Sequence, residues 1–126
     1  MKSQQTFQCP VEATISLIGG KYKAVILWHL VDKTLRYSEL SRLISSATPK
    51  MLTQQLRELE EDGLVSRQVY PVVPPKVEYS LTDFGKSIIP VLDAMCAWGS
   101  GYLATSSPET KVCPSKLTAS VSIIAE

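Results

Sequence analysis

The segment from Thr48 to Gly63 constrains the fold of this chain more than any other. Threonine is a favoured N-cap and proline suits the first helical position, so Thr48-Pro49 marks a helix start. Glycine commonly follows the end of a helix, so Gly63 predicts a helix from Pro49 to about Asp62. One stripe of this helix consists of Leu52, Leu56 and Leu59. This leucine stripe is predicted to be buried.

The opposite side of the same helix is polar. It carries Lys50, Gln54, Arg57 and Glu61, with Thr53 at its edge. Arginine and lysine pair with phosphates or guanine edges, glutamine bonds adenine at two atoms, and threonine contacts either. The free N–H groups at a helix start also favour a phosphate. An amphipathic helix alone is most often an ordinary surface helix, so the neighbouring segments decide between that interpretation and DNA contact.

The neighbouring segments favour DNA contact. Apolar spacing predicts helices over residues 10–18, 21–31 and 38–44, followed by a turn over residues 45–48. After Gly63, β-rich runs over residues 64–70 and 77–81 flank a proline-rich tip, which is typical of a hairpin. A short helix, a turn and a longer helix form a helix-turn-helix, and the hairpin forms a wing. The predicted fold class is mainly α with a small two-stranded β-wing, a winged helix-turn-helix that presents one helix to a major groove about 12 Å wide.

The last helix is predicted to start after Thr82 and to be kinked at Pro90. Its apolar stripe is too large for a small domain to bury, which favours a two-fold homodimer. The residues predicted at the dimer interface are Phe84, Ile88, Leu92, Met95, Trp98 and Tyr102. Two recognition helices would then meet half-sites about 34–36 Å apart in a palindromic operator.

Charge is distributed unevenly along the chain. The total is only +1, which is weak support for binding nucleic acid. Residues 20–57 contain seven Lys and Arg against two Asp and Glu, a net charge of +5, and residues 58–62 contain four acidic residues, a net charge of −4. The acidic segment is expected to point away from DNA. Lys21 and Lys23 are expected to lie on a solvated face, with phosphate contact as the alternative.

Other classes of protein find little support. There is one histidine, no glycine-rich phosphate loop and no set of catalytic groups, so an enzyme is not expected, and no cofactor or metal site is predicted. Residues 1–8 lack the apolar run of a signal peptide, and no run approaches about 18 apolar residues. We therefore expect a cytoplasmic protein with reduced thiols. The alternative function is a winged-helix protein-interaction module without DNA binding.

Several separated motifs resemble the HxlR family of bacterial transcription regulators. They are Cys9-Pro-Val-Glu, Ile18-Gly-Gly-Lys-Tyr-Lys, Arg36-Tyr-Ser-Glu-Leu, the segment from Lys50 to Leu64, Val73-Pro-Pro-Lys-Val-Glu-Tyr-Ser-Leu-Thr and Trp98-Gly99. The resemblance implies a homodimer with a dimer core built by the terminal helices. It spans residues 9–103, between a flexible arm over residues 1–8 and a flexible tail over residues 104–126. The candidate DNA-binding residues are Ser38, Thr48, Lys50, Thr53, Gln54, Arg57 and Lys76.

The three cysteines have different expected roles. Cys9 precedes Pro10 and is a candidate N-cap, where the positive end of a helix favours the reactive thiolate. It matches a cysteine through which some HxlR-family members sense oxidants or electrophiles, so Cys9 is a candidate redox sensor. An inert N-cap thiol is the open alternative. Cys96 is expected to be a packing residue, and Cys113 lies in the predicted tail.

Overall fold

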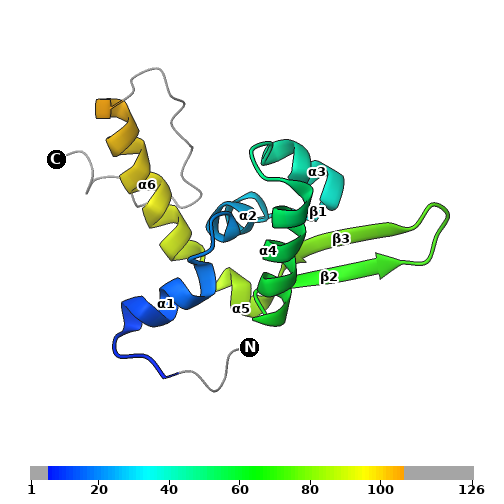
Figure 1. The fold of residues 1–126 in the computed structure, drawn as a ribbon, viewed down its shortest axis with the longest axis horizontal. Coiled ribbons are helices and arrows are strands. Elements are labelled where there is room, and N and C mark those ends of the chain that lie inside the picture. The colour runs from blue at the N-terminus through cyan, green and yellow to red at the C-terminus, as the bar shows by residue number, and fades with distance from the viewer. Residues whose placement is uncertain (1–5, 107–126) are drawn as a thin grey trace. The chain divides into compact units, whose positions relative to one another are not determined.

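A computed structural model describes residues 6–106, and the chain divides into a first unit ending at Lys86 and a second beginning at Ser87. Cys113 and most of the predicted tail lie outside the described residues. The elements of the first unit are α1 (Pro10–Ile18), α2 (Lys23–His29), β1 (Leu35–Arg36), α3 (Tyr37–Leu43), α4 (Pro49–Glu61), β2 (Val65–Tyr70), β3 (Lys76–Leu81) and α5 (Asp83–Lys86). The second unit contains α6 (Ile89–Ser106) (Figure 1).

Helix α4 begins and ends where its sequence predicts. Thr48 is the N-cap, and its hydroxyl oxygen accepts a hydrogen bond from the Met51 N–H at 3.1 Å. At the other end Gly63 has a φ of 82°, a left-handed conformation that glycine adopts without steric cost. The Leu64 N–H donates to the Leu59 carbonyl at 3.0 Å, which closes the helix end.

The core of the first unit is built mainly from leucine and isoleucine on three helices. Leu52, Leu56 and Leu59 are at most 2% exposed, which confirms the predicted inner stripe of α4. Helices α2 and α3, the C-cap of α2, the turn after α4 and the start of β2 supply the other fully buried side chains of this core. They are Ile26, Leu27, Leu30, Leu40, Leu64 and Val65. Fixing one side of α4 in this core leaves its other side to the surface.

The wing belongs to a three-stranded antiparallel sheet with strand order β1-β3-β2. Val65 pairs with Leu81 and Tyr70 with Lys76, so the hairpin is in register along its whole length, and it extends beyond the helices of the first unit (Figure 1). Leu35 and Arg36 add a third strand by pairing with Tyr79 and Glu78. The predicted two-stranded wing is confirmed as the hairpin of β2 and β3, and β1 is a short edge strand that the sequence does not predict.

The chain after the hairpin forms two helices, where one kinked helix was predicted. The Thr82 hydroxyl donates to the Gly63 carbonyl at 2.6 Å and accepts from the Gly85 N–H at 2.9 Å, so Thr82 caps α5 as expected. Helix α5 ends at Lys86, and Pro90 is the second residue of α6. Proline has no N–H to donate to a preceding turn but fits a first turn well, so it starts a new helix here.

Helix α6 exposes an apolar stripe. Val91, Met95, Trp98 and Tyr102 are spaced four, three and four residues apart and are all exposed. The rings of Trp98 and Tyr102 stack with their centroids 5.6 Å apart. Ile88 and Leu92, also expected at the interface, are at most 8% exposed and have little surface left for a partner. Among the described helices, none is both long and apolar enough to cross a membrane.

Candidate nucleic-acid interface

The outer face of α4 is open to solvent. Lys50, Thr53, Gln54 and Arg57 are all exposed, and together with Pro49, Glu58 and Glu61 they line one open hollow on the surface. No other element of the first unit covers these side chains. Asp62 is buried, whereas Glu58 and Glu61 belong to this same surface, where the helical spacing places Glu61.

The first turns of α4 are tied to α3 through Tyr37. The Tyr37 hydroxyl donates to the Pro49 carbonyl at 3.2 Å, and the Thr53 hydroxyl donates to the Tyr37 oxygen at 3.5 Å. Ser38, the next residue of α3, is exposed. This contact fixes the turn between the two helices, and it places the Thr53 hydroxyl at the edge of the outer face.

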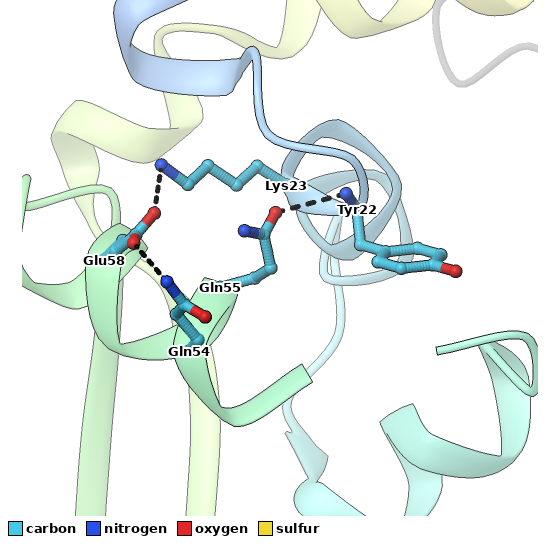
Figure 2. Close-up of polar contacts among 5 residues, drawn as sticks. All are labelled: Tyr22, Lys23, Gln54, Gln55 and Glu58. Carbon is cyan, nitrogen blue, oxygen red and sulfur yellow. Dashed lines mark hydrogen bonds and ion pairs between the residues drawn. The ribbon is translucent and has the colours of Figure 1, made fainter. Parts of the chain in front are cut away.

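The middle of α4 is held by the segment that leads into α2 (Figure 2). The Tyr22 N–H donates to Gln55 Oε1 at 3.1 Å, and the Tyr22 hydroxyl donates to the Ser46 carbonyl at 3.1 Å. Gly20 lies against the Gln55 amide, where a Cβ atom would collide with it. Gly20 therefore allows the close approach that this backbone-to-side-chain hydrogen bond needs.

Lys23 and Glu58 form an ion pair at the edge of the outer face (Figure 2). Lys23 Nζ lies 2.7 Å from Glu58 Oε1, and Gln54 Nε2 donates to Glu58 Oε2 at 3.3 Å. Lys23 is only 5% exposed, so the expectation of a solvated Lys23 is wrong. The residues missed by sequence reasoning are thus the supports of the outer face. The four-residue spacing of Gln54 and Glu58 signals the contact between these two side chains, and no such local spacing signals the contacts of Tyr22, Lys23 or Tyr37.

Lys76, the candidate on the wing, lies apart from this group. Its ammonium is 3.4 Å from Glu78 Oε2 and 5.0 Å from the centre of the Tyr70 ring, both within the hairpin. Lys76 does not line the hollow on α4. The structure therefore brings together Lys50, Thr53, Gln54 and Arg57, with Thr48 at their start, and keeps Lys76 at the hairpin.

Cys9 is the N-cap of α1, as predicted. Its backbone is extended (φ −154°, ψ 159°), and its thiol is free and exposed. Within the described part of the chain this thiol makes no capping hydrogen bond. Cys96 is buried. Among the described residues, no three His, Cys, Asp or Glu side chains are grouped to hold a metal ion.

A helix-turn-helix with a hairpin wing and an exposed polar face on its second helix defines a winged-helix transcription regulator. The chain belongs to the HxlR-like helix-turn-helix family, whose model matches residues 17–107. It is 53% identical over 100 residues to YtcD of Bacillus subtilis, an HTH-type transcriptional regulator, covering 79% of each protein.

Two solved structures of the redox regulator HypR are also similar. The oxidised form matches with a TM-score of 0.70 and 53% identity, covering 72% of this chain and 94% of HypR. The reduced form matches with a TM-score of 0.74 and 47% identity, covering 79% of this chain and 99% of HypR. The fold is therefore shared with a regulator that has been seen in two redox states.

Proposed function

We propose that this protein binds double-stranded DNA sequence-specifically as a homodimer and that α4 enters the major groove. The observation that carries the proposal is the exposed polar face of Lys50, Thr53, Gln54 and Arg57 on a helix whose other side is buried leucine. A helix fits a major groove when one face is fixed in a scaffold and the other offers hydrogen-bonding groups.

Each residue of this face has a distinct role in the proposal. Lys50, near the positive end of α4, binds a phosphate, and Arg57 pairs with a guanine edge or a phosphate. Gln54 and Thr53 read base edges. Thr48 uses its oxygen as the cap of α4 and keeps its hydroxyl hydrogen for a phosphate. Ser38 of α3 and Lys76 of the wing contact the DNA backbone on the flanks of the site read by α4.

The apolar stripe of α6 supports the homodimer. A monomer exposing Val91, Met95, Trp98 and Tyr102 side by side leaves a patch that aqueous proteins generally bury in an interface. A second copy offers the same patch, which a two-fold axis brings face to face. Phe84 is also exposed and is assigned to the interface, whereas buried Ile88 and Leu92 support it from below the surface. A two-fold dimer implies a palindromic operator.

Cys9 supports a thiol-based switch as a second element of the proposal. Its thiol is free and exposed, and it lies at the N-terminus of α1, where a reagent in solution can reach it. HypR, a regulator with an oxidised and a reduced form, provides the parallel. In this proposal an oxidant or electrophile modifies Cys9 and weakens or strengthens DNA binding. An inert N-cap thiol remains the alternative.

DNA binding is tested by selecting duplexes from a random pool with the full chain and measuring affinity by fluorescence anisotropy. We expect a palindromic consensus and weaker binding by Gln54→Ala and Arg57→Ala. Lys86→Ala is the matched control, because it removes an exposed cation from α5, which does not line the hollow. Failure to enrich any sequence, with the dimer intact, would favour a protein-interaction module.

The thiol switch is tested on the same duplex. Treatment of the protein with diamide or N-ethylmaleimide is expected to change its affinity for the duplex, and Cys9→Ser is expected to abolish that change. An equal response in Cys9→Ser would remove Cys9 from the mechanism and leave DNA binding itself unaffected.

A further inference from the structure

We propose that Glu58 fixes the orientation of the Gln54 amide and thereby makes α4 select adenine over guanine at one position of each half-site. Glu58 acts here as a positioning residue, and the proposal rests on the DNA binding proposed above. It concerns an acidic side chain that charge alone would exclude from a DNA-binding face.

The carboxylate of Glu58 is engaged at both oxygens (Figure 2). Oε1 takes the Lys23 ammonium at 2.7 Å, and Oε2 accepts from Gln54 Nε2 at 3.3 Å. Lys23 is 5% exposed, so moving Glu58 away would leave a buried ammonium without its partner, which is costly. Lys23 therefore holds Glu58 in place beside Gln54.

A fixed carboxylate permits one orientation of the neighbouring amide. With Nε2 toward Glu58, the contact is a charge-assisted hydrogen bond. With the amide turned over, Gln54 Oε1 would face a negatively charged oxygen that has no hydrogen to share. Gln54 is thus set before DNA arrives, with its carbonyl oxygen and its second N–H available to a base.

This pair of groups matches adenine. Adenine presents the N6 donor and the N7 acceptor in the major groove, which complement one carbonyl oxygen and one N–H. Guanine presents two acceptors, O6 and N7, and would require both N–H groups of the amide. One of those N–H groups is held by Glu58, so guanine loses half of its contact.

The variant Glu58→Gln is expected to reverse this choice. The Lys23 ammonium only donates, so it retains the carbonyl oxygen of the new amide and leaves that amide's NH₂ facing Gln54. Gln54 then turns its own carbonyl oxygen toward this NH₂. Both N–H groups of Gln54 become available, which matches guanine. Glu61→Gln is the matched control, because Glu61 lines the same hollow and loses the same charge.

The experiment selects duplexes from a random pool with the wild-type chain, Glu58→Gln, Glu61→Gln and Gln54→Ala. The position at which Gln54→Ala loses its preference identifies the base read by Gln54. We expect the ratio of adenine to guanine there to exceed about fivefold in the wild type, the lower range for a bidentate contact, and to invert in Glu58→Gln. Glu61→Gln is expected to keep the wild-type ratio.

A double variant guards against loss of folding. Lys23→Met with Glu58→Met removes the ion pair without leaving a buried charge, and it is expected to bring adenine and guanine to equal preference. Unchanged preference for adenine in both Glu58 variants would overturn the proposal while DNA binding stands. Equal loss of preference at every position would show a merely structural role and also overturn it. Failure of the wild type to select any duplex would overturn both proposals.

Discussion

Helices α4 and α6 both leave one stripe of side chains at the surface, but the two stripes differ in chemistry. The outer stripe of α4 is polar, and its Gln54 and Thr53 side chains are hydrogen-bonded to Glu58 and Tyr37. The outer stripe of α6 is apolar, with Trp98 63% exposed. Hydrogen-bonding groups suit base edges and phosphates, whereas aromatic surface suits another protein. Two helices of one small chain are thus suited to two different partners.

The largest expected effect comes from a substitution in the apolar stripe of α6. Trp98→Glu places a charge in the centre of the proposed interface, and tryptophan commonly dominates interface energies. We expect the dimer dissociation constant to rise by about 30-fold or more, measured by sedimentation equilibrium.

The wing supplies a control for this variant. Val73 is 99% exposed at the hairpin tip, so Val73→Glu introduces the same charge on an apolar surface residue outside α6. We expect Val73→Glu to leave the dimer dissociation constant unchanged. If Trp98→Glu and the wild type had the same dimer dissociation constant, the α6 stripe would not be the dimer interface.

A smaller effect is expected on the α4 side. Arg57→Ala removes one charged contact to DNA, so the affinity for the selected duplex should fall by about tenfold. Lys50→Ala should weaken binding to all sequences alike and lower the slope of log affinity against log salt concentration by about one. Anisotropy titrations at several salt concentrations measure the affinity of each variant and this slope. If Arg57→Ala bound the duplex with wild-type affinity, the DNA-binding surface would not include Arg57.

The smallest expected effect compares the starts of two helices. The Thr48 hydroxyl caps α4, so Thr48→Ala should lower the free energy of unfolding by about 1 kcal/mol. The Cys9 thiol makes no capping bond to the described part of the chain, so Cys9→Ala should change the free energy of unfolding much less. Urea unfolding of both variants measures the difference. Equal losses would contradict the account, because they would mean that the Thr48 cap adds no more stability than the Cys9 thiol.

The features predicted correctly from the sequence depend on local signals. Thr48, Pro49 and Gly63 define α4 because caps and helix ends are encoded by neighbouring residues. The apolar spacing and the glycine after Ile18 likewise predict a helix from Pro10 to Ile18, and α1 has these bounds. These bounds also predict the exposed polar face of α4, because a helix that buries one stripe of side chains leaves the opposite stripe exposed to solvent.

The missed features depend on contacts between distant parts of the chain. Strand β1 has two residues, which is too short to show an alternating pattern, and it exists only through pairing with β3. Lys23 reaches Glu58 across 35 positions of sequence, and only the packing of α2 against α4 makes that ion pair visible. Pro90 within the apolar stripe predicts a kink, but a proline in a first turn is equally consistent with the new helix that the structure contains.

The central claim assigns DNA to the outer face of α4 and a second copy of the chain to the stripe of α6. Its most direct test is site-specific photocrosslinking of the DNA-bound protein, with benzoylphenylalanine replacing either Gln54 or Tyr102. We expect the probe at position 54 to label the duplex and the probe at position 102 to label a second copy. Labelling of protein but not DNA from position 54 would contradict the account.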